Sequence, residues 1–238
     1  MEGRIVNNYR VSKLAFEDMN KDGIKEVMVL WSHVRRFPSI FLIYDLEGNE
    51  LFRYSHTGIL QLFILNSIKE EERFIFIGGT NNLLGGDAVL GVIGIHDLKS
   101  GLGPPYDIPK DLRDQQWIEK YIPVEPEKAS QKGYIRFKQN EISRQNGVQW
   151  MFVLEVRAGK NEIMVLVNYG LSSICPLYFV FDSNFHLKYV TPGANFGRLY
   201  EDLYKEGKVA LELEGFLKKC EEDVLFWTGD GWISPLSE

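Results

Sequence analysis

The chain has 238 residues, of which 45% are apolar, so it is long enough and apolar enough to bury a large core. Its formal net charge is -6 and its Lys and Arg residues form no basic stripe, which argues against nucleic acid as a partner. No apolar run approaches the ~20 residues that a membrane-spanning helix needs, so direct membrane insertion is not expected.

The first distinctive stretch is a short acidic loop at residues 18–26. Its candidate metal ligands, all offering oxygen, are Asp18, Asn20, Asp22, Ile24 through its carbonyl, and Glu26. Calcium takes six or more oxygen ligands and Gly23 permits a sharp turn, so the loop with added water is a candidate calcium site. An apolar strand follows at once, so the ion would tie two strands together. The metal-free alternative is a turn in which the same side chains accept hydrogen bonds from backbone amides.

Strand-like segments recur along the chain as an internal repeat. The letters EVMVL at 26–30 return as EIMVL at 162–166, and a proline, a second apolar segment and an aspartate follow each copy. A third copy of this order occupies residues 73–101. Another apolar segment precedes each copy, which makes four short strands in ~40–50 residues, the pattern of one propeller blade.

The pattern predicts an all-β, β-propeller-like fold in a single domain, with about four blades of short antiparallel strands. The predicted units are residues 11–58, 59–103 and 148–193, an irregular fourth unit at 194–238, and a long insertion at 104–147. Helical periods occur at 112–120, 198–207 and 216–222, and a strand is expected at 209–213. The proline-rich insertion is either a binding surface or a flap over an open sheet edge.

Residues 78–86 are rich in glycine and follow a strand, as phosphate-binding loops do. A helix follows such loops, whereas residues 88–95 are a further apolar strand, so a long hairpin loop is expected. Together with residues 32–38 and 168–175, the loop at 79–87 is predicted to form the recognition face.

Two sets of residues carry a resemblance to a known family. The pattern DxNxDGxxE at 18–26, followed by an apolar strand, resembles the cation loop of FG-GAP repeats, the blades of integrin-α-like propellers. Residues 76–82, 87–93 and 100–106 look like FG-GAP-like, VCBS-type domains at the C-terminal end of multidomain bacterial regulatory or membrane-anchored proteins. The resemblance covers most of residues 11–233, and it implies a propeller, a calcium ion and a place in a larger chain.

The sequence departs from this family pattern in two ways. Only the first unit keeps its acidic loop, because residues 66–72 and 157–162 stand at the equivalent positions. Three or four blades are also fewer than a closed propeller of this family needs. A partial or open propeller is therefore expected, or a piece whose remaining blades lie upstream.

The predicted function is a non-catalytic ligand- or protein-binding or sensor module of a larger bacterial signalling or surface system. Its ligand is a protein, a small molecule or a carbohydrate. The alternatives are a carbohydrate-active enzyme of glycosidase or lyase type on the same scaffold, and an architectural spacer. No catalytic residue is assigned, because the four histidines stand apart without metal-ligand spacing. A cytoplasmic location is expected for a complete chain, and an extracytoplasmic one for a part of a membrane-anchored protein.

Overall fold

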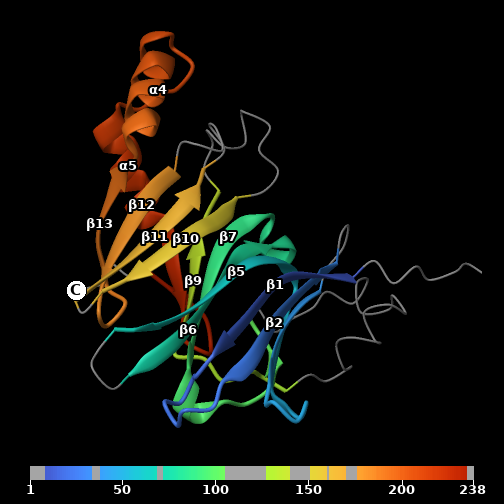
Figure 1. Ribbon diagram of the computed structural model, residues 1–238. Coiled ribbons are helices and arrows are strands. Elements are labelled where there is room, and N and C mark those ends of the chain that lie inside the picture. The colour runs from blue at the N-terminus through green and yellow to red at the C-terminus, as the bar shows by residue number, and fades with distance from the viewer. Residues whose placement is uncertain are drawn as a thin grey trace, which may run out of the picture.

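Strands dominate the fold (Figure 1). The computed structural model describes residues 9–33, 38–68, 72–104, 127–139, 151–159, 161–169 and 176–234. The predicted helical period at 112–120 lies outside these residues. The described strands form three sheets, none of which closes on itself, and all neighbouring strands are antiparallel except for one short parallel pair.

The first sheet has the strand order β1-β2-β3-β4-β8. Its strands are β1 (Tyr9–Glu17), β2 (Glu26–His33), β3 (Ser39–Tyr44), β4 (Glu50–His56) and β8 (Gly101–Leu102). The first four follow one another in chain order as a meander, and β8 pairs in parallel with β4. The acidic loop connects β1 to β2.

The central sheet has the order β15-β14-β9-β7-β6-β5. Its strands are β5 (Gly58–Ser67), β6 (Arg73–Asn81), β7 (Asp87–Gly94), β9 (Gly133–Phe137), β14 (Val224–Trp227) and β15 (Trp232–Ile233). Two short 3-10 helices, Asn82–Leu84 and Ile95–Asp97, flank β7.

The third sheet is a four-stranded meander with the order β10-β11-β12-β13. Its strands are β10 (Phe152–Ala158), β11 (Glu162–Asn168), β12 (Pro176–Asp182) and β13 (Leu187–Pro192). Two helices follow, α4 (Ala194–Lys205) and α5 (Leu213–Glu222). Neither of these two helices is long and apolar enough to cross a membrane.

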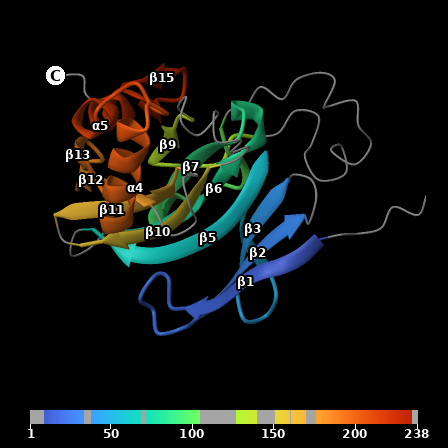
Figure 2. The same cartoon turned by 90° about the horizontal axis from the view of Figure 1, so that it is seen from above.

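The central sheet is covered on both faces, as Figures 1 and 2 show. On one face Phe76 and Leu90 belong to a buried cluster that includes the third sheet and extends to the two helices, and on the other Ile75 and Ile77 belong to a cluster with the first sheet. Residues of β6 and β7 are therefore buried almost throughout, which explains their unbroken apolar sequence.

The β5–β6 pair depends on two glycines that allow a close backbone approach. A Cβ atom on Gly58 would lie 1.9 Å from the carbonyl oxygen of Thr80, and one on Gly79 would lie 2.1 Å from that of Ile59. No side chain fits at either position without moving the paired strand.

The outer face of the first sheet is apolar, and it is exposed along β1, whereas Ile40 and Leu42 of β3 on the same face are buried. Val11 pairs with Trp31, Leu14 with Val29 and Phe16 with Val27, so these side chains share the face that points away from the central sheet. Val11, Leu14, Phe16 and Trp31 are exposed by 39–53% in the described part of the chain. Antiparallel sheets with one face in water usually carry polar residues there, so this face departs from the usual alternation.

The prediction of a mainly β chain is confirmed, while the four-bladed propeller stays a prediction. Residues 224–233, expected in a fourth unit, form β14 and β15 and join the central sheet. The strand β9, from within the predicted insertion, lies between β7 and β14. Residues 209–212 form an irregular connection into α5 where a strand was expected. The local pattern of strand-forming residues is the same for any partner, so it does not indicate which sheet a strand joins.

Candidate functional site

A groove of about 640 Å³ opens where three segments that are distant in sequence meet. They are residues 128–133, which lead into β9, the β12–β13 turn, and the β14–β15 hairpin with the residue that follows it. The groove is lined by the aromatic side chains Phe185, Phe226 and Trp227, by the basic side chains Lys128, Lys132 and His186, and by amides and hydroxyls that include Asn184 and Thr228. None of the described residues that line it is an Asp or a Glu.

Aromatic packing holds the β14–β15 wall of the groove. The Trp227 ring meets Trp232 edge to face, with ring centroids 5.2 Å apart. Trp232 in turn contacts Tyr134 at 6.0 Å, and the Arg136 guanidinium lies 5.6 Å from its ring centroid. Such contacts are worth about 0.5–1.5 kcal/mol each beyond the buried area, so the indole of Trp227 is held in place before a ligand arrives.

The β12–β13 turn forms another wall of the groove, and Asp182 organises this turn. Its carboxylate Oδ1 accepts hydrogen bonds from the amides of Asn184 at 2.8 Å and His186 at 2.9 Å. Phe185 takes a positive φ of 67°, and its ring meets Phe74 edge to face at 6.0 Å. The turn therefore presents Phe185 and His186 to the groove from a fixed backbone.

The ionisation of Asp182 suits this structural role. Partial burial acts to raise the pKa of the carboxyl group, but the hydrogen bonds from His186 and Asn184 outweigh it and lower the pKa below its usual value. The carboxylate stays charged and directed at the turn, because His186 Nδ1 also lies 3.1 Å from Asp182 Oδ2.

The acidic loop lies at the same edge of the sheets as the groove. The Arg73 guanidinium donates to the carbonyls of Asp18 and Met19, the latter at 3.0 Å. Phe74, the next residue of β6, contacts Phe185 of the groove. The central sheet thus connects the loop and the groove at one end of β6.

The predicted calcium ligands cap backbone amides of their own loop. The Asp18 carboxylate accepts from the amides of Asp22 at 3.1 Å and Gly23 at 3.0 Å, and Asp22 accepts from Ile24 at 2.7 Å. Glu26 is buried and its Oε2 accepts from the Met19 amide at 2.7 Å. Asn20 Oδ1 also accepts from the Asp22 amide at 3.1 Å. These are the contacts of the metal-free turn weighed above.

The oxygen atoms of this loop are of the kind that calcium binds, but in the structure they accept hydrogen bonds from backbone amides as in an ordinary turn. All the side chains offer oxygen, and a carboxylate oxygen that accepts one amide keeps a second acceptor position. Among the described residues, no three His, Cys, Asp or Glu side chains converge in a way that could hold a metal ion. Calcium binding by Asp18, Asn20, Asp22, Ile24 and Glu26 therefore stays a prediction.

Of the predicted recognition face, the loop at 79–87 lies at the other end of the central strands. Residues 79–87 form the β6–β7 hairpin, with Asn81 and Asp87 paired at its end. Gly133 of the groove pairs with Val92, toward the far end of β7 from Asp87. Residues 34–37 and 170–175, from the other two loops of that face, lie outside the described residues.

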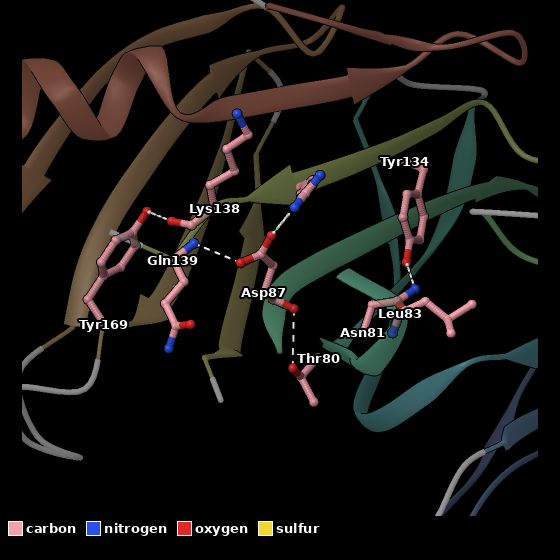
Figure 3. A network of polar contacts seen from close by, with 9 residues as sticks. Thr80, Asn81, Leu83, Asp87, Tyr134, Lys138, Gln139 and Tyr169 are labelled. Carbon is pink, nitrogen blue, oxygen red and sulfur yellow. Dashed lines mark hydrogen bonds and ion pairs between the residues drawn. The ribbon is translucent and has the colours of Figure 1, made fainter. Parts of the chain in front are cut away.

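A buried polar network fills the hairpin end (Figure 3). Asp87 Oδ1 accepts from the Gln139 amide at 2.8 Å, and its Oδ2 accepts from Arg136 Nε at 2.6 Å. The Thr80 hydroxyl donates to the Asp87 carbonyl at 3.2 Å. The network ties β6, β7 and β9 together, which is a structural role.

Asn81 and His56 extend this polar region toward the first sheet. Asn81 Nδ2 donates to the Tyr134 hydroxyl at 3.0 Å and to the Pro104 carbonyl at 3.2 Å, and its Oδ1 accepts from the Leu83 amide at 2.9 Å. The Tyr134 hydroxyl also lies 2.9 Å from His56 Nε2. Complete burial lowers the pKa of His56 to about 3, so its imidazole is neutral at ordinary pH.

No pattern in the sequence identifies the residues that line the groove. Its lysines, its turn and its hairpin come from three parts of the chain, and no spacing rule links them. The one local signal is the cluster of Phe226, Trp227 and Trp232 within a short hairpin, which places three large aromatic rings near a turn.

No family model matches this chain, and neither the curated proteins nor the solved structures contain a match to it.

Proposed function

We propose that this chain is a non-catalytic binding module whose ligand, an oligosaccharide, lies in the groove. The observation that carries the proposal is the lining, in which aromatic rings stand beside amides and hydroxyls. A sugar ring has an apolar C–H face and a rim of hydroxyl groups, so this combination matches it. The resemblance to FG-GAP domains supports a place for the module in a larger bacterial signalling or surface protein.

We also propose that the three sheets are blades of an open propeller, with calcium at the acidic loop of the first. Two observations support the propeller: the first and third sheets contain four-stranded meanders, and the central sheet is covered by a sheet on each face, as a blade is by its neighbours. On this proposal the apolar outer face of the first sheet is where a further blade would pack.

A glycan array followed by calorimetry tests the binding proposal. We expect selected oligosaccharides to bind, and Trp227→Ala to weaken binding at least tenfold because the stacking surface is lost. Asn184→Ala removes an exposed groove amide without touching the core, and it should also weaken binding. Tyr189→Ala removes an exposed aromatic ring of β13 outside the groove and should leave affinity unchanged.

The same oligosaccharides should be recovered intact after long incubation. Turnover that disappears when a single carboxylate is substituted would overturn the non-catalytic proposal in favour of a carbohydrate-active enzyme. An array on which nothing binds would overturn the carbohydrate ligand.

A further inference from the structure

The groove differs in charge from the rest of the protein. The chain carries 33 acidic and 27 basic residues, yet the groove is lined by Lys128, Lys132 and His186 without a carboxylate. A groove lined by basic side chains attracts anions locally, even on a protein whose net charge is negative.

Three carboxylates beside the groove make contacts of their own. Asp97 lies 3.4 Å from Lys132 Nζ, and the two side chains are 74% and 54% exposed. An ion pair this exposed contributes little to stability, so a carboxylate of the ligand can replace Asp97 as the partner of Lys132. Glu127 lies 3.3 Å from Lys99, and Asp182 is directed at its own turn. None of these carboxylates lines the groove.

The two lysines come from one of the segments that line the groove, and Phe185 comes from another. The stem of Lys132 lies along the end of β7, since a Cβ atom on Gly94 would lie 3.0 Å from its Cε. This packing fixes the stem and leaves the ammonium group at the surface. A ligand that stacks on the aromatic rings therefore passes within reach of positive charge.

We infer that the oligosaccharide bound in this groove is acidic, with carboxylate groups that pair with Lys128 and Lys132. The inference rests on the proposed function, and it assigns the charge of the ligand. The sugar rings stack on the aromatic side chains that line the groove, while amides and hydroxyls of the groove bind the sugar hydroxyl groups. The lysines select sugars that carry carboxylates, because a solvated ammonium group gains more from a carboxylate than from a hydroxyl.

Paired sugars that differ only in charge test this inference on the full chain. The probes are uronate oligosaccharides and their methyl esters, together with sialylated glycans and their esters, measured by calorimetry at low and high salt. We expect each acid to bind about tenfold more tightly than its ester, and the difference to shrink at high salt.

The double variant Lys128→Gln, Lys132→Gln should lower the affinity for the acids to that for the esters, and leave the esters unaffected. Lys208→Gln, which removes an exposed lysine outside the groove, is the control and should change neither. Circular dichroism confirms that each variant is folded.

The possible failures differ. Equal binding of acids and esters, lost together in Trp227→Ala, would overturn the acidic ligand and leave the proposed binding function standing. If the double lysine variant still binds the acids more tightly than the esters, the inferred pairing of the ligand with Lys128 and Lys132 is wrong. Failure of every acid and ester to bind, with an empty glycan array, would overturn the proposed function as well.

Discussion

Asp87 shows what a buried charge requires of its surroundings. Its side chain is 5% exposed and lies 2.5 Å from Arg136 Nη2, while Gln139 donates its amide to the same carboxylate. Asp87 is buried and Arg136 is half-buried, so the two charges stabilise the fold mainly as a pair, because each one alone has lost much of its water. The network therefore matters more for the joining of β7 to β9 than any exposed ion pair of the chain.

We predict that Asp87→Ala destabilises the protein by about 2–4 kcal/mol, because the half-buried Arg136 guanidinium and Gln139 amide are left without their acceptor. Asp97→Ala, which breaks an exposed pair with Lys132, should cost no more than about 1 kcal/mol. Urea unfolding of the two variants beside the wild type measures both. Equal, small effects would mean that water replaces the carboxylate at Asp87.

His56 makes stability depend on pH in a defined direction. Burial lowers the pKa of His56 from 6.5 to about 3. Between these two pH values the imidazole is protonated in the unfolded chain and neutral in the folded one. The contribution of the buried, neutral His56 imidazole to the free energy of unfolding is complete above pH 6.5. This contribution is lost as the pH falls from 6.5 toward 3, because protonation favours the unfolded chain. The slope approaches about 1.4 kcal/mol per pH unit.

We therefore expect His56→Gln to weaken the loss of stability between pH 6.5 and 4.5, although the variant is less stable at pH 7 because the contact with Tyr134 changes. Urea unfolding at several pH values, with and without the substitution, gives the difference between the two slopes. Parallel slopes would show that the imidazole is protonated in the folded state.

At the scale of elements, the acidic loop between β1 and β2 has two roles that are separable by experiment. Asp22 caps the Ile24 amide at 2.7 Å, so its loss destabilises the turn whether or not calcium binds. The calcium proposal thus depends on the response to the metal and not on stability alone. A calcium concentration 100 times the Kd would add about 2.7 kcal/mol.

We predict that calcium raises the Tm, that chelation reverses the rise, and that Asp22→Ala abolishes the response. Asp45→Ala is the matched control, because Asp45 caps Asn49 in the β3–β4 turn in a similar way, with Oδ1 accepting from the amide at 2.7 Å. That variant should keep the full calcium response. A Tm insensitive to calcium and chelator, in wild type and Asp22→Ala alike, would leave the loop as a turn only.

At the scale of the molecule, the layering predicts how fast each strand exchanges its amide hydrogens. β6 and β7 lie inside the central sheet with both faces covered, whereas β1 is an edge strand with exposed apolar side chains. Amides are protected by burial and by the cooperative opening of their surroundings.

We expect hydrogen exchange to be slowest in β6 and β7 and much faster in β1, as measured by mass spectrometry on the isolated chain. Protection of β1 equal to that of β6 at every protein concentration would contradict an open arrangement, because the outer face of the first sheet would then be covered. Protection that rises with concentration would locate an association at this face.

Much of the fold follows from local sequence. The apolar segments at 26–30, 162–166 and 177–182 lie within β2, β11 and β12, and the segment at 40–45 matches β3 except for its last residue. Runs of Val, Ile, Phe and Tyr between turn residues favour strands wherever they occur, so these elements need no distant partner to be recognised. The helices at the end of the chain followed from their amphipathic period in the same way, although each begins three or four residues earlier than expected.

By itself, then, the sequence determined that the chain is mainly β, where most strands lie, and that residues 18–26 form an oxygen-rich turn. Only the tertiary structure decided that β9 and β14 join the central sheet, and that Lys128, Phe185 and Trp227 meet in one groove. The physical reason is that the tendency to form a strand depends on residues that are neighbours in the sequence. The choice of a partner strand depends on backbone hydrogen bonds and core contacts between segments far apart in the chain.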